Sequence, residues 1–140
     1  MTNHTFVRIV NEAFVPLLSR LGFSSEAPVL RGRFNSASFL RKDYVVDVSY
    51  EPGDEAIIIM VLRRKDGKLS DIDDPANTVR LDTLKERYMH LVTREEFEEG
   101  NVAFGAVRAT DPTEQLMVKS ARELALVLPK YLADSRQEAP

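Results

Sequence analysis

Three closely spaced carboxylates, Asp71, Asp73 and Asp74, have the residue type and spacing that could hold a metal ion. Carboxylate oxygens in a loop are the ligands that hard cations such as Ca²⁺ prefer. An EF-hand loop starting at Asp71 would need glycine at its sixth position and glutamate at its twelfth, where the chain has Ala76 and Asp82. We therefore predict a solvated acidic loop without a bound metal, and keep these three aspartates as the candidate ligands.

Basic side chains on the predicted strands form a second candidate site. Four arginines would converge if the strands that carry them pair with one another, and they would then form an anion site or a patch for an acidic partner. The alternative is that they lie on the wet faces and ends of strands, where basic side chains discourage edge-to-edge association. We favour this alternative because neither glycine-rich phosphate-binding motif occurs. The four are Arg31, Arg33, Arg63 and Arg64, with Arg41, Lys42 and Lys65 nearby in the sequence.

Groups suited to acid–base or nucleophilic catalysis are scarce. The chain has no cysteine, which excludes disulfides, thiolate metal sites and cysteine nucleophiles. It has two histidines, and helical spacing places His90 on the solvent side of a helix. The glutamates at 95, 96, 98 and 99 are typical of a solvated helix face. Because no acid can be paired with a base, we predict no catalytic residue and no cofactor, and favour a protein that is not an enzyme.

Charge and hydropathy argue against nucleic-acid and membrane partners. The net charge is −3, with +2 over residues 1–70 and −5 over residues 71–140. The chain lacks the dense basic stripe of a nucleic-acid binder, and it has no tryptophan to act as a stacking platform. No apolar run approaches the roughly 18 residues that a membrane span needs, and the N-terminus has no signal-peptide pattern. We predict a cytoplasmic protein.

Two amphipathic helices are predicted near the ends of the chain. Apolar residues recur at helical spacing over residues 6–21 and again over residues 117–132. Gly22 suits the end of the first helix, where a left-handed residue is common. Pro16 and Pro129 lie inside the two patterns, so we expect a kink at the first and an interruption at the second.

Between the two helices the hydrophobic period changes to that of β-strands. Alternating residues predict half-buried strands, and an apolar run rich in β-branched residues predicts a central strand. Pro52-Gly53 suits a tight turn, which makes the strands on either side of it antiparallel. The predicted strands are 30–34, 44–50, 56–62, 78–81 and 102–107, with a bend at 35–38.

Two short helices are expected before the last of these strands. Leu81, Leu84 and Tyr88 share one helical face, which predicts the first. Thr93 and Glu96 have the spacing of a capping box, which predicts a second helix that ends at Gly100.

The two amphipathic helices have more apolar surface than is needed to pack each of them on one face of a sheet. Val15 projects from the polar side of the first helix, and Leu126 lies among charged residues of the last. One interpretation is that each helix is sandwiched between the sheet and loops, since single exposed apolar residues are common. The other is that Val15 and Leu126 belong to an interface with a second copy or with another protein.

Together these patterns predict one α+β domain over residues 1–140, with a frayed tail at 133–140. An antiparallel sheet of about four to five strands would be covered on one face by the N- and C-terminal helices. In element order, size and acidity the chain resembles two groups of small bacterial proteins, the polymorphic-toxin immunity proteins and the dimeric chaperones of type III secretion. This resemblance is one of layout, it carries no site residue, and residues 66–100 depart from the chaperone pattern.

Two classes of function remain open at this point. The first is a non-catalytic protein-interaction module that binds a partner protein or forms a homodimer, because no catalytic constellation accompanies the surplus apolar surface. A subunit of a larger assembly would differ from it mainly in stoichiometry. The second is a small-ligand-binding protein or enzyme with a pocket between sheet and helices, lined by Tyr44, Tyr50 and the strand arginines.

Overall fold

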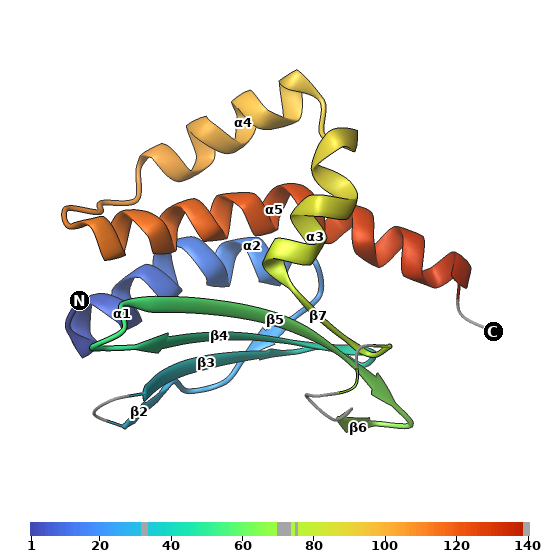
Figure 1. Ribbon diagram of the computed structural model, residues 1–140, viewed down its shortest axis with the longest axis horizontal. Helices are drawn as coiled ribbons and strands as arrows, with labels where there is room; N and C mark the ends of the chain where they lie inside the picture. The colour runs from blue at the N-terminus through green and yellow to red at the C-terminus, as the bar shows by residue number, and fades with distance from the viewer. Residues whose placement is uncertain (32–33, 70–73, 75, 139–140) are drawn as a thin grey trace.

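The computed structural model describes residues 1–31, 34–69, 74 and 76–138, with side chains described through residue 134. It has the predicted α+β architecture, in which one antiparallel sheet carries helices on one face (Figure 1). Within the described residues the sheet has seven strands, more than the four to five expected, because four of them are only two or three residues long. Asp71 and Asp73 of the predicted acidic loop, and Arg33, lie outside the described residues.

The first helical segment changes register once before Pro16. It consists of α1 (Asn3–Ile9), a π-helical turn η1 (Val10–Phe14) and α2 (Val15–Arg20). Pro16 has no N–H to donate, and the π-turn places the register change directly before it, where Val15 N–H donates to the Val10 carbonyl. The segment ends as predicted, because Gly22 adopts a φ of +88°.

Three long strands form the middle of the sheet, and each neighbouring pair is antiparallel. They are β3 (Phe34–Leu40), β4 (Tyr44–Glu51) and β5 (Ala56–Lys65). Residues 52–55 join β4 to β5, with Gly53 at a φ of +110°, a conformation that glycine adopts without strain. β1 (Ser24–Ser25) and β2 (Val29–Arg31) pair with β3, while β6 (Lys68–Leu69) and β7 (Thr78–Arg80) pair with β5.

The bend predicted at residues 35–38 is wrong, since these residues lie inside β3. Asn35, Ala37 and Phe39 alternate toward the helices and are buried, whereas Ser36 and Ser38 face the other side. The small polar residues suggest a bend by composition, but the pairing with β4 extends the chain through them.

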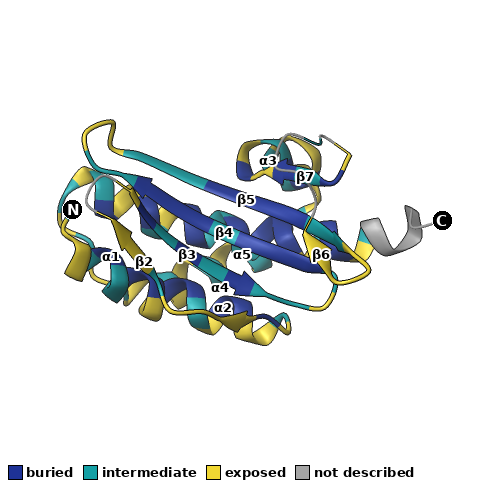
Figure 2. Ribbon diagram, turned by 90° about the horizontal axis from the view of Figure 1, so that it is seen from below, coloured by how far each residue is buried: buried dark blue, intermediate teal, exposed yellow. Residues whose placement is uncertain are grey.

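The core lies between the sheet and the layer formed by α1, η1, α2 and α5 (Pro112–Glu138) (Figure 1). Val46 and Val48 of β4, Phe14 of η1 and Leu124 of α5 are fully buried in it. Figure 2 shows β3, β4 and β5 from the opposite side, where no helix of the described chain covers the sheet. The sheet is therefore covered by helices on one face, as predicted.

The strand predicted at residues 102–107 is wrong, because residues 102–105 continue a helix and residues 106–107 form a turn after it. After α3 (Leu81–Tyr88) and the 3-10 turn η2 (Met89–Leu91), the helix α4 spans Arg94–Gly105. The Thr93–Glu96 capping box is confirmed at its start, yet the helix passes through Gly100 instead of ending there. Gly100 lies on the face that packs against α5, where a small residue allows close approach.

The last helix is longer than its apolar pattern. Pro129 lies inside α5 without interrupting it, and its exposed position keeps its ring out of the core. The helix extends to Glu138, although a frayed end was expected from residue 133. Asp111 caps its start, where Glu114 N–H donates to the Asp111 carboxylate at 2.8 Å.

A third layer, α4, accounts for much of the surplus apolar surface. It packs along the side of α5 that faces away from the sheet (Figure 1). Leu126 is consequently only 6% exposed, which agrees with the interpretation that the last helix is covered by neighbouring elements of the chain. Val15 is half-buried and packs against the core. The sequence pattern predicts only the first part of this helix, because the apolar run at residues 102–107 suggests a strand.

Candidate functional site

Two surface regions of the described chain carry charged side chains that form no ion pair within it. The first is the sheet-end cleft, at the end of the sheet where the β3–β4 and β5–β6 turns meet the end of α2. The second is the α4 outer face, on the side of α4 that points away from α5. The cleft is lined by Leu21, Gly22, Arg41, Lys42, Asp43, Arg64, Asp66 and Gly67, and the α4 outer face by Glu95, Glu98, Glu99, Val102 and Ala103.

Arg41 is the most constrained side chain of the sheet-end cleft. Its Nε and Nη2 donate to the two carboxylate oxygens of Asp43, at 2.6 and 3.0 Å, and its Nη1 donates to the Leu21 carbonyl at 2.9 Å. Its guanidinium carbon also lies 5.4 Å from the ring centre of Phe23 and 5.8 Å from that of Tyr44. The hydrogen bonds that Arg41 donates to Asp43 raise the pKa of Arg41, so its charge is held in this pair.

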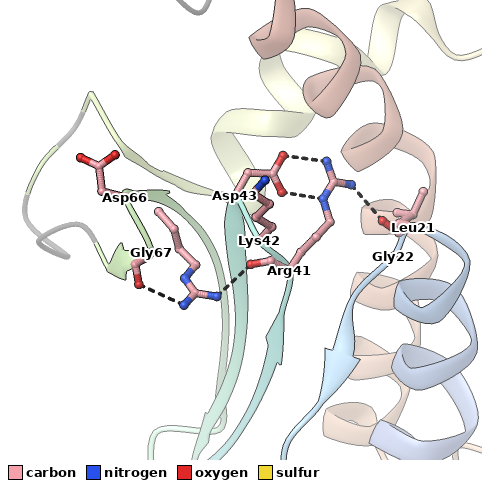
Figure 3. Close-up of a pocket in the computed structure, with 8 residues that line it drawn as sticks. Leu21, Gly22, Arg41, Lys42, Asp43, Asp66 and Gly67 are labelled. Atoms are coloured by element: carbon pink, nitrogen blue, oxygen red, sulfur yellow. Dashed lines mark hydrogen bonds and ion pairs between the residues drawn. The ribbon is translucent and has the colours of Figure 1, made fainter.

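Arg64 is held in the cleft by carbonyl groups instead of a carboxylate. Its Nη1 donates to the Arg41 carbonyl at 2.9 Å and its Nη2 donates to the Gly67 carbonyl at 3.0 Å. The two carbonyls belong to different turns, so the guanidinium spans them (Figure 3). Asp66 and Gly67 both have positive φ, at 53° and 74°, as a two-residue type I′ hairpin turn requires.

The predicted arginine patch is not assembled as a whole. Arg31 pairs with Phe34 in the register between β2 and β3, whereas Arg63 lies opposite Tyr44 in the register between β4 and β5. These pairs lie at opposite ends of the sheet. Arg63 lies over the ring of Tyr44, with its Cζ 5.9 Å from the ring centre, and Arg64 lies in the cleft. Asp66-Gly67 is recognisable as a turn from the sequence, whereas the turn of residues 41–43, which places Lys42 in the same cleft as Arg64, was not predicted.

The remaining predicted metal candidate, Asp74, has a local structural role. Its carboxylate accepts from the Ala76 N–H at 3.0 Å and from the Asn77 side-chain amide at 2.6 Å. The bond from Asn77, followed by that from Ala76, lowers the pKa of Asp74. This arrangement is an Asx turn that leads into β7. No group of three or more metal-binding side chains occurs among the residues that the structure describes.

Tyr44 and Tyr50, which were expected to line a pocket between sheet and helices, are both buried in the core. Tyr50 stacks on Phe6 and donates to Glu55 at 2.9 Å. A small groove of about 180 Å³ does lie between β5, α3 and α5. Its wall carries the ion pair between Lys85 and Glu123, whose Nζ and Oε2 atoms are 2.7 Å apart.

The α4 outer face is apolar at its centre and acidic around it. Val102 is 81% exposed, the highest value among the exposed large apolar side chains of the described chain. Glu95, Glu98 and Glu99 surround it together with Ala103. Glu98 pairs with Arg94 at 3.1 Å, whereas no ion pair to Glu95 or Glu99 is formed within the described residues.

The inner side of the same helix contacts α5. Glu96 accepts from the Lys130 ammonium at 3.1 Å and from the Thr93 N–H at 2.9 Å. These bonds, with the one from Thr93 the larger, lower the pKa of Glu96. Phe97 lies under the guanidinium of Arg122, whose Cζ is 5.9 Å from the ring centre. α4 is therefore fixed on α5 by one side and unpartnered on the other.

Comparison with known proteins identifies no relative. No protein-family model, no curated protein and no solved structure matches the chain. The described helices include none with the length and apolar character needed to span a bilayer.

Proposed function

We propose that the protein is a non-catalytic protein-interaction module that binds a basic partner protein through the α4 outer face. The observation that carries this proposal is the two-sided character of α4. One side contacts α5 through Glu96, Phe97 and Gly100, and the opposite side presents Val102 within a group of glutamates.

An acid-rimmed apolar centre has the composition of a small docking site. Burial of an exposed apolar side chain favours association, and surrounding charges increase the rate of encounter with an oppositely charged partner. Glu95 and Glu99 form no ion pair within the described chain, so their charge is available to a partner. The net charge of −3 adds to this attraction for a basic protein.

A second copy of the chain fits this face less well. In a two-fold symmetric dimer the same patch meets itself, so the glutamates around Val102 would face the same glutamates of the partner. Like charges in close apposition cost free energy unless they are neutralised. The partner that matches this surface is therefore a different, basic protein.

The experiment compares which proteins the tagged full-length chain retains from an extract of its native host. Val102→Asp places a charge at the centre of the α4 outer face, and Leu69→Asp makes the same type of change at another exposed apolar residue, which is 59% exposed. We expect the unmodified chain and Leu69→Asp to retain the same basic protein, and Val102→Asp to lose it. Equal retention by all three chains, or a strict monomer in light scattering that retains no protein, would contradict the proposal.

A further inference from the structure

We propose that the sheet-end cleft binds the oxyanion group of a small anionic ligand, a phosphate or a carboxylate, through Arg64 and Lys42. The cleft has a volume of about 910 Å³, which lies within the range of small-molecule sites. It is remote from the α4 outer face, since α4 and the sheet lie on opposite sides of α5 (Figure 1). This inference is therefore independent of the protein-docking proposal.

The first argument is that the Arg64 guanidinium is held in place before any ligand binds. An exposed arginine normally loses side-chain entropy when it binds, and that cost lowers affinity. Here the carbonyls of Arg41 and Gly67 already orient Nη1 and Nη2. The Arg41 side chain is itself locked by Asp43 and by the Leu21 carbonyl, so the wall that supports Arg64 is rigid.

The second argument concerns charge. The two carbonyls that hold Arg64 are neutral, so they orient its charge without cancelling it. Within the described chain neither Arg64 nor Lys42 forms an ion pair, whereas Arg41 is paired with Asp43. Figure 3 shows the Asp66 carboxylate directed away from the other labelled residues of the cleft. Two positive charges therefore line the cleft, and no carboxylate of the described residues forms an ion pair with either.

The third argument concerns geometry. A guanidinium has five N–H groups, and Arg64 uses two of its nitrogens toward protein carbonyls. The remaining N–H groups can donate to an oxyanion, and a planar fork matches the oxygens of a carboxylate or a phosphate. Lys42 adds a flexible ammonium at the same cleft, which suits an anion of either shape.

The test is a titration of the full-length protein with inorganic phosphate, with acetate, and with sodium chloride at matched ionic strength, followed by the amide resonances of residues 41–43 and 64–67. We expect saturable shifts with phosphate, with acetate or with both at millimolar concentration, and none with chloride. The oxyanion that binds more tightly identifies the class of ligand. Absence of saturable shifts with both oxyanions at tens of millimolar would overturn the proposal.

Variants then assign the binding to the proposed residues. Arg64→Gln and Lys42→Gln are each expected to weaken the oxyanion affinity, the first by about tenfold or more because a charged fork is lost. Arg64→Lys keeps the charge without the fork, so its oxyanion affinity is expected to lie between those of the unmodified chain and the Arg64→Gln chain. Arg31→Gln, at the other end of the sheet, is the matched control and should leave the affinity unchanged. Equal affinity of the Arg64→Gln and Arg31→Gln chains would also overturn the proposal.

Discussion

Asp47 shows how a single residue can oppose the stability of the fold that contains it. It lies in the middle of β4, on the sheet face without a helix, between Ser38 of β3 and Met60 of β5. Burial raises the pKa of Asp47, and the hydrogen bond from Ser38 opposes this rise only in part. A raised pKa in the folded state means that ionisation of Asp47 costs folding free energy.

The pH dependence of this cost follows from the sign of the shift. Asp47 contributes no penalty below its unfolded pKa of 3.8, where it is protonated in both states, and the penalty grows as pH rises through the folded value. Asp47→Asn should therefore stabilise the protein at pH 7 and change its stability much less at pH 3. Urea denaturation midpoints at the two pH values measure this, with exposed Asp54→Asn as the control. Equal effects of the two substitutions at both pH values would contradict the assignment.

Leu126 provides a second test at the scale of one residue, because its burial depends on α4. We expect Leu126→Ala to lower the free energy of unfolding by about 2–4 kcal/mol, as for a buried leucine. Leu116→Ala changes the same residue type in the same helix at a position that is 43% exposed, and should cost less than about 1 kcal/mol. Chemical denaturation of both variants gives the comparison, and similar losses would show that α4 does not cover Leu126.

At the scale of the element, the sequence predicts best the segments whose apolar residues follow either the helical or the strand spacing throughout. The apolar face of residues 6–21 is buried apart from Leu21, and the β4–β5 pair has the antiparallel register that the Pro-Gly turn implies. The start of α4 was predicted from its capping box, but its second part was predicted as a strand because Val102 and its neighbours form a short apolar run, which suits a strand or a helix equally. Its packing against α5 decided the outcome, and that contact is not encoded locally.

The candidate site was predictable only in part for a similar reason. Arg64 was among the arginines chosen from the sequence, but its role depends on two carbonyls from separate turns. Backbone carbonyls leave no signature in side-chain type, so no spacing rule could have found them. The one local signal in the sequence is the Asp66-Gly67 pair, because Asp-Gly is typical of a tight hairpin turn. The positive φ values of both residues agree with that turn.

The helical state of residue 100 can be tested directly. Gly100 lies inside α4 without a positive φ, and a Cβ there would lie 3.5 Å from Arg122 Cγ and 3.7 Å from Leu126 Cδ2, which are ordinary contact distances. Gly100→Ala should therefore stabilise the protein by up to about 1 kcal/mol through helix propensity. Gly53→Ala, at a φ of +110°, should instead destabilise it by about 1 kcal/mol. Thermal denaturation measures both, and destabilisation by Gly100→Ala would contradict a helix that passes through this residue.

At the scale of the whole molecule, three layers separate two surfaces of opposite character. The sheet end carries Lys42 and Arg64 in a cleft, and the outermost helix carries glutamates around Val102. The α5 layer between them buries the surplus apolar surface that the sequence indicated. The candidate apolar interface is therefore the α4 outer face, where Val102 is exposed, and not the region around the buried Leu126.

The most direct test of the central proposal is retention of a basic partner as the charge of the α4 outer face is reversed. The double variant Glu95→Lys/Glu99→Lys and the control Glu26→Lys/Asp54→Lys change the net charge equally, and all four residues are exposed. The proposal predicts that the unmodified chain and the control retain the partner at about 0.05 M salt and progressively lose it toward about 0.5 M, whereas the α4 variant loses it throughout. Identical retention by the two double variants would contradict it.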